Sequence, residues 1–175
     1  MFATYFNQPL KSWNVSKGTD MSYMFAITQF NQPLNKWNVS KVTQMASMFD
    51  TATNFNQPLK SWNVLNVKSF WGMFGNATKF NQPLNKWDVS NVTNMFSIFD
   101  TAKNFNQSLE SWNVAKATNM MSMFSTAINF NQDLSNWNVS NALIMNGMFD
   151  TATSFNQPLK SWDVLNVNDI SYMFQ

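Results

Sequence analysis

The chain of 175 residues contains no cysteine and no histidine. These absences exclude disulfide bonds, thiolate chemistry, the usual zinc sites and acid–base catalysis by imidazole. Glycine is scarce, with 4 residues in the whole chain, and no phosphate-binding glycine loop is recognisable. No pair of carboxylates and no pairing of a nucleophile with a base stands out either. We therefore expect a protein that is not an enzyme and that has no catalytic residue, metal site or cofactor.

Charged residues are also scarce, at 11% of the chain against roughly 25% in average soluble domains. The formal net charge is +2, and the basic residues form no run. We therefore expect no nucleic-acid partner and no attraction to an acidic membrane surface. Long apolar runs are missing as well, so we expect neither a signal peptide nor membrane insertion by this chain. The polar surface must consist mainly of Asn, Gln, Ser and Thr.

The dominant feature of the sequence is a repeat of about 25 residues. Phe-Asn-Gln begins at seven positions, each followed at constant spacing by a Leu, a Trp and a Val. The consensus is F-N-Q-P-L-x-x-W-N-V-S-x-V-T-x-M-x-x-M-F-x-x-A-x-x. Such similarity predicts that each repeat makes the same contacts with the next. We assign residues 1–175 to a single solenoid of seven repeats, at about 6–29, 30–54, 55–79, 80–104, 105–129, 130–154 and 155–175.

Two local patterns divide each repeat. Leu-x-x-Trp-x-Val alternates around its Trp and Val, which predicts a short strand with both side chains directed inward. In the second repeat, an apolar stripe predicts a helix of about three turns; it comprises Val42, Met45, Met48, Phe49 and Ala52. The predicted fold class is an α/β repeat. Specifically, we expect a right-handed, leucine-rich-repeat-like solenoid with one short parallel strand and one short helix or helical turn per repeat.

Stacked repeats would place each Trp over the next Trp and each Phe over the next Phe. Burial of one aromatic side chain is worth about 4–6 kcal/mol before the entropy of ordering is subtracted. Two such columns, together with Leu and Met, are expected to hold the array without disulfides.

The asparagine of Phe-Asn-Gln is present in every repeat. We interpret this column as a structural ladder that satisfies buried backbone amides, in preference to a repeated ligand contact. For the neighbouring glutamines, Gln8 through Gln157, a second ladder and an exposed edge are equally compatible with the pattern. The predicted ladder comprises Asn7, Asn31, Asn56, Asn81, Asn106, Asn131 and Asn156.

Polar residues that flank Trp and Val form the candidate binding face, because solenoids commonly bind partners on a regular face. A solvated polar surface is the competing interpretation for any single residue. Trp71 lies outside the periodic Trp column and is either an exposed aromatic contact or a cover over a loop. Asp88 and Asp163 share a column but lie too many repeats apart to share a metal ion. The candidate face comprises Asn14, Lys36, Asn38, Asn63, Lys86, Asp88, Asn113, Asn136, Asn138 and Asp163.

The segment Leu-x-x-Trp-x-Val, followed by Val-Thr-x-Met-x-x-Met-Phe-x-x-Ala-x-x-Phe-Asn-Gln, resembles the repeat of the BspA-like leucine-rich-repeat surface proteins. The resemblance extends over all seven repeats. It implies a leucine-rich-repeat-like solenoid, a cell-surface or secreted location, and a role in adhesion or in binding a protein or glycan.

Both ends of the chain fall in the same phase of the repeat, and neither shows a polar capping segment. Two interpretations follow: the chain is a slice of a longer protein, or its uncapped ends associate with copies of itself. Our leading hypothesis is a non-catalytic binding or adhesion module that acts through the candidate face. The alternative is a structural spacer or assembly unit that stacks end to end in a fibre, sheath or virion.

Overall fold

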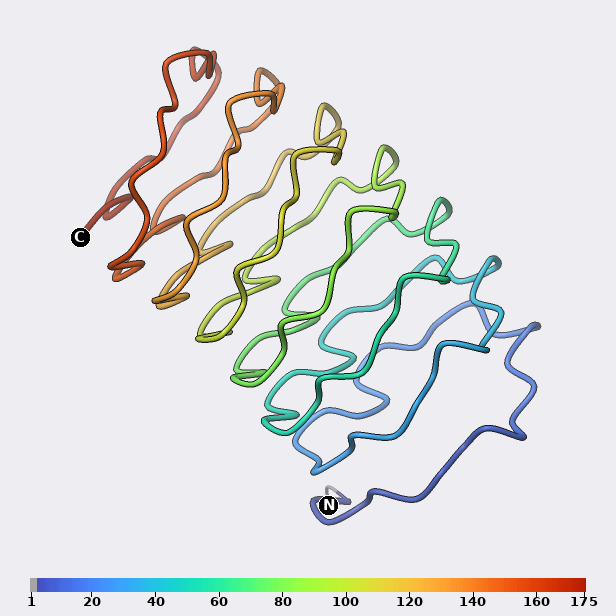
Figure 1. Ribbon diagram of the computed structural model, residues 1–175. Coiled ribbons are helices and arrows are strands. Elements are labelled where there is room, and N and C mark those ends of the chain that lie inside the picture. The colour runs from blue at the N-terminus through green and yellow to red at the C-terminus, as the bar shows by residue number, and fades with distance from the viewer. Residues whose placement is uncertain (1–2) are drawn as a thin grey trace.

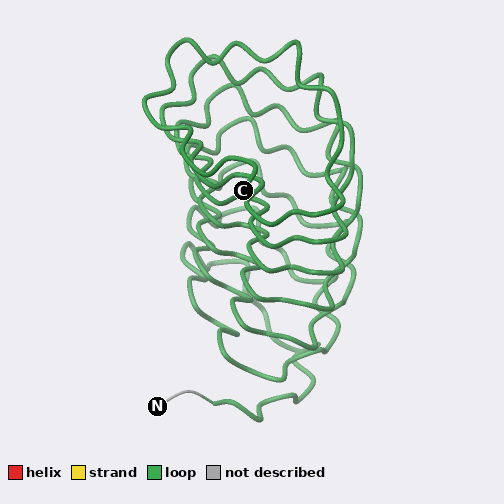
Figure 2. Cartoon of the chain, turned by 90° about the vertical axis from the view of Figure 1, so that its left-hand side faces the viewer, coloured by secondary structure: helices red, strands yellow, loops and turns green. Residues whose placement is uncertain are grey.

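A computed structural model describes residues 3–175 as a coil of stacked windings (Figure 1). We call each winding a rung, and each rung corresponds to one sequence repeat. No residue of this described range belongs to a helix or an extended strand, and Figure 2 shows loop throughout. None of it could therefore cross a membrane as a helix. The β pairing within the described range is one column of isolated parallel bridges, which joins Asp20, Gln44, Ser69, Asn94, Asn119, Ile144 and Asp169.

The tandem repeat is confirmed, but the predicted α/β fold with a strand and a helix in every repeat is wrong. In place of the helix over 42–52, backbone N–H groups alternate between two kinds of partner. One set donates to carbonyl oxygens of the following rung at 2.6–3.3 Å and comprises Met45, Ser47, Phe49 and Thr51. The other set donates to the residue three positions earlier at 3.0–3.3 Å and comprises Met48, Asp50 and Ala52.

This alternation explains why the apolar spacing was misleading. An α-helix would use every N–H group after its first turn within its own segment, which would leave those groups unable to join neighbouring rungs. Consecutive turns closed by three-residue hydrogen bonds also bring residues three apart onto one side of the backbone. Val42, Met45 and Met48 are therefore buried as predicted, although the backbone that carries them is not helical.

Left-handed backbone recurs within these turns. Ser47 has φ 50° and Thr51 has φ 58°, and equivalent residues in the other rungs have similar values. Both are third residues of a hydrogen-bonded turn, where a positive φ is characteristic of type II geometry. Glycine occupies the first of these two positions only at Gly72 and Gly147, with φ of 59° and 62°. The remaining rungs place an L side chain in a conformation that such residues rarely adopt.

The predicted strand Leu-x-x-Trp-x-Val is an extended segment between two turns. In the second rung, Trp37 N–H donates to the Leu34 carbonyl at 3.0 Å, and Val42 N–H donates to the Val39 carbonyl at 2.9 Å. Between these turns the side chains alternate as predicted, with Trp37 and Val39 buried and Asn38 exposed. The segment is not a strand, because its backbone is not paired with the equivalent backbone of the next rung.

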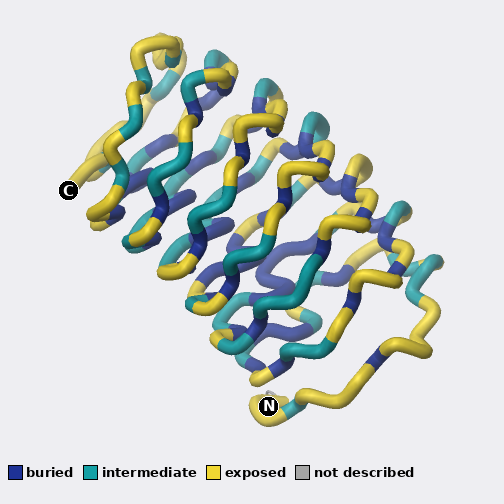
Figure 3. Tube along the Cα trace, in the orientation of Figure 1, coloured by how far each residue is buried: buried dark blue, intermediate teal, exposed yellow. Residues whose placement is uncertain are grey.

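The predicted stacking of aromatic residues occurs along the Phe columns and at three steps of the Trp column. Most of these residues are buried, and Figure 3 shows that buried positions recur from rung to rung along the chain. The rings of Trp62 and Trp87 lie 6.3 Å apart at an interplanar angle of 2°. Those of Phe49 and Phe74 lie 5.6 Å apart at 3°. In the first rung, which is covered on one side only within the described residues, Trp13 is 54% exposed.

Candidate binding surface

Asparagine side chains join successive rungs at the Phe-Asn-Gln corner. Asn31 Oδ1 accepts hydrogen bonds from the Asn56 backbone N–H at 3.0 Å and from Gln57 Nε2 at 3.0 Å. The same two bonds recur at every step from Asn7 to Gln157. The asparagine ladder is therefore present, and the glutamine column, which the sequence left undecided, forms part of it. These oxygens are committed to holding the array together.

A second link between rungs was not foreseen from the sequence. Trp62 Nε1 donates to the Leu34 carbonyl of the preceding rung at 3.0 Å, and Trp87 Nε1 donates to the Leu59 carbonyl at 3.0 Å. The indoles of the other rungs, from Trp37 to Trp162, make equivalent bonds. The constant Leu-x-x-Trp spacing was the only available signal, and it does not reveal that the bond crosses between rungs.

All ten residues of the candidate face are exposed, but seven of them also have a local structural role. In these seven, the side-chain Oδ1 accepts the backbone N–H two residues later at 3.0–3.2 Å. This Asx turn shapes the corner after each Trp and occupies an acceptor that a ligand would otherwise contact. The seven residues are Asn14, Asn38, Asn63, Asp88, Asn113, Asn138 and Asp163.

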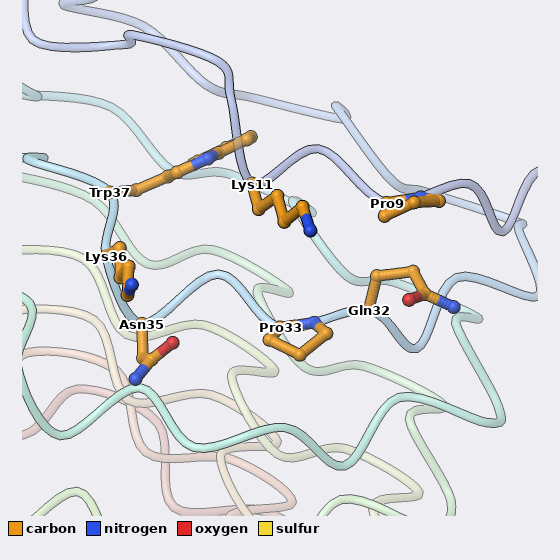
Figure 4. Close-up of a pocket in the computed structure, with 7 residues that line it drawn as sticks. All are labelled: Pro9, Lys11, Gln32, Pro33, Asn35, Lys36 and Trp37. Atoms are coloured by element: carbon orange, nitrogen blue, oxygen red, sulfur yellow. The ribbon is translucent and has the colours of Figure 1, made fainter.

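The remaining three residues, Lys36, Lys86 and Asn136, each precede a Trp, and two of them, Lys36 and Asn136, border hollows in the surface. A hollow of about 370 Å³ lies between the first two rungs and is lined by Pro9, Lys11, Gln32, Pro33, Asn35, Lys36 and Trp37. We call it the lysine hollow. In Figure 4 the Lys11 side chain runs between Pro9 and Trp37, while Lys36 and Asn35 lie on the neighbouring rung. Sequence analysis found Lys36 but missed Lys11, although lysine recurs in the same column at Lys60 and Lys160.

A second hollow of about 340 Å³ lies farther along the same face. It is lined by Asn85, Ser108, Glu110, Ser111 and Asn136. Asn136 Nδ2 donates to Glu110 Oε1 at 3.1 Å, so that this carboxylate already has a partner. The two hollows thus differ in charge: the first carries two ammonium groups and no carboxylate, and the second carries one carboxylate.

The pKa values of two carboxylates along the coil are shifted in opposite directions. Hydrogen bonds from the hydroxyl and backbone N–H of Ser90 hold the pKa of Asp88 below its ordinary value. Burial raises the pKa of Asp100, and the charge of Asp50 acts in the same direction. Asp100 is half-buried, and the hydroxyl of Thr101 donates to its Oδ1 at 3.0 Å.

Among residues 3–175, no three acidic side chains come together in a way that could hold a metal ion. Trp71, whose role the sequence left open, is 40% exposed and stacks on Phe96 with ring centroids 6.2 Å apart. It therefore belongs to a surface column and not to the interior. The structure does not bring Trp71 to the candidate face, because it lies in the turn segment that carries the inter-rung backbone bonds.

A family model described as "Mycoplasma protein of unknown function, DUF285" matches residues 1–96 and again residues 73–175. Together the two matches span the whole chain, which therefore belongs to this family. No curated protein and no solved structure matches the chain.

Proposed function

We propose that this member of the DUF285 family is a non-catalytic binding module that recognises a protein or glycan through the exposed polar face beside its Trp column. The lysine hollow is the observation that carries the proposal. It combines an apolar wall of Pro9, Pro33 and Trp37 with the polar groups of Lys11 and Lys36 in one concave site. A few polar groups above an apolar wall are typical of ligand sites.

The chemistry of the lysine hollow favours a ligand that carries an anionic group. Its two lysines have no carboxylate among the lining residues, and the side-chain amide of Asn35 adds a hydrogen-bond donor. Gln32 donates its amide hydrogen to Asn7 Oδ1 at 3.1 Å, so its own oxygen remains available as an acceptor. A sugar bearing a carboxylate or sulfate would pair with the ammonium groups and lay its apolar ring face on the prolines.

Heparin oligosaccharide is a suitable probe, with neutral dextran as the comparison. We expect Lys11→Gln combined with Lys36→Gln to weaken heparin binding by about tenfold or more, because both charge partners are lost. Lys60→Gln combined with Lys86→Gln is the matched control, since these residues occupy the same repeat positions and carry the same charge but lie outside the hollow. Equal losses in the two double variants would show that net charge, and not the hollow, determines binding.

A location on the cell surface is part of the proposal, and it is supported by the resemblance to the BspA-like surface proteins. Protease treatment of intact cells is expected to remove the protein, while a cytoplasmic enzyme in the same cells survives. Protection of the protein until the cells are lysed would contradict the surface location and leave the ligand proposal to the heparin experiment.

A further inference from the structure

A column of residues with an apolar centre runs along the side of the coil that carries the inter-rung backbone hydrogen bonds. The column lies two residues beyond the bridge residues and consists of Ser22, Ala46, Trp71, Phe96, Met121, Asn146 and Ser171. Its apolar members occupy the middle rungs, and polar residues lie at both ends. Tyr23 packs edge-on against Trp71 with ring centroids 6.5 Å apart. We call Tyr23, Trp71, Phe96 and Met121 the aromatic stripe.

The aromatic stripe is open to solvent. Tyr23 is 53% exposed and Trp71 is 40% exposed, while Phe96 and Met121 are half-buried. In the rung after Met121 the column holds Asn146, and Leu143 and Ile144 of the two adjoining columns are 42% and 37% exposed. Beside the stripe lie Thr43, Thr93 and Thr118, whose hydroxyls donate to carbonyls of the preceding rung at 3.2–3.3 Å. A group of exposed apolar side chains next to polar ones is typical of a protein interface.

Charge is distributed unequally along the coil. Residues 1–87 contain eight lysines and two aspartates, which gives a charge of +6. Residues 88–175 contain three lysines, six aspartates and one glutamate, which gives −4 and accounts for the net +2 of the whole chain. Since successive rungs follow one another along the axis (Figure 1), the molecule has a positive half and a negative half.

We propose that the aromatic stripe binds a second copy of this chain in an antiparallel, side-by-side arrangement. The stripe runs from Tyr23 in the first rung to Met121 in the fifth, so a two-fold axis near Phe96 brings Trp71, Phe96 and Met121 of the two copies together. The same axis places the positive half of each copy against the negative half of the other. A parallel arrangement would oppose like charges and is disfavoured.

The first test is self-association measured by sedimentation equilibrium. Trp71→Ser combined with Phe96→Ser is expected to raise the dimer dissociation constant by about tenfold or more, because buried aromatic residues dominate such interfaces. Leu165→Ser is the matched control, since Leu165 is 88% exposed in the last rung and outside the stripe. A wild-type chain that stays monomeric at about 1 mM would overturn the proposal. A greater loss in the Leu165 variant would instead indicate contact through the end rungs.

The second test concerns charge. Raising the ionic strength from about 0.05 M to about 0.5 M is expected to weaken the dimer several-fold, because exposed charges are screened. The opposed halves do not orient the copies if the dimer becomes tighter with salt and if reversing the charge at Lys41 and at Asp150 leaves its affinity unchanged.

The third test uses the absence of cysteine from the chain. Thr93 lies beside Phe96, and we expect two copies of the Thr93→Cys variant to form a disulfide with each other under mild oxidation. Thr19→Cys and Asn168→Cys lie in the same column at opposite ends, so a disulfide is expected mainly when these two variants are mixed. Efficient crosslinking of each end variant with itself would indicate a parallel pair. A mixed disulfide without the Thr93 crosslink would indicate end-to-end stacking, and either outcome contradicts the proposal.

Discussion

The indole Nε1 of Trp87 donates to the carbonyl oxygen of Leu59 at 3.0 Å, and the same carbonyl accepts the backbone N–H of Trp62 at 3.0 Å. One oxygen thus closes a turn in its own rung and holds the indole of the next rung. A carbonyl oxygen has two lone pairs, and here the protein uses both. This shared acceptor couples the local turn to the stacking of rungs.

We expect Trp87→Phe to reduce the free energy of unfolding by about 2–3 kcal/mol. About 1 kcal/mol reflects the lost hydrogen bond, and the remainder reflects the space left by the smaller ring in a buried column. The Leu59 carbonyl keeps its bond from Trp62, which prevents a larger loss. Chemical denaturation measures the change. Trp13→Phe is the control, with an expected loss below about 1 kcal/mol because Trp13 is 54% exposed.

We expect Asn81→Ala to cost about 1–3 kcal/mol of unfolding free energy, because its Oδ1 accepts from both the Asn106 N–H and Gln107 Nε2 at 3.0 Å. Asn81→Asp retains an acceptor at the same place and should lose less stability. Exposed Asn85→Ala is the control and should change stability by no more than about 0.5 kcal/mol. If Asn81→Ala and Asn85→Ala proved equally mild, the ladder would not be a major source of stability.

We expect Thr126→Asn to stabilise the fold by about 0.5–1 kcal/mol, because Asn tolerates left-handed backbone better than a β-branched residue. Thr126 has φ 54°, and Asn76 already occupies the equivalent position of another rung with φ 53°. Thermal unfolding of the variant tests this expectation. Thr153→Asn, at an exposed position outside the left-handed set, should have little effect; a gain of the same size there would point to a cause other than backbone conformation.

We expect opposite pH dependences from substitutions at Asp100 and Asp88. The folded-state pKa of Asp100 is raised. Its contribution to the free energy of unfolding is therefore present below the unfolded-state pKa and is lost as the pH rises through the folded-state pKa. Asp100→Asn removes that loss. As the pH rises from about 3 to about 7, the variant should therefore become more stable relative to wild type.

The pKa of Asp88 is lowered, so its contribution is present above the unfolded pKa and is lost as the pH falls through the folded pKa. Asp88→Asn should therefore be less stable than wild type near about pH 7, with the difference shrinking toward about pH 3. Melting temperatures across this range test both variants, and parallel curves for the two would contradict the assigned environments.

Residue type and spacing determined which side chains enter the interior. Trp37, Val39 and Phe49 are buried as the repeat predicted. Their burial follows from the spacing of apolar residues, and this spacing is visible within a single repeat of the sequence. The asparagine column was recognisable for a related reason: a polar residue that recurs in every rung beside buried residues needs a partner in the adjacent rung.

The backbone conformation, in contrast, was decided by tertiary structure. The spacing from Val42 to Ala52 suits both a helix and a series of turns, and only the neighbouring rung selects between them. By accepting hydrogen bonds from alternate N–H groups such as those of Ser47 and Phe49, that rung favours turns with left-handed residues over a helix that satisfies itself. The lysine hollow and the aromatic stripe arise in the same way, because residues about 25 positions apart become neighbours only after the rungs have stacked.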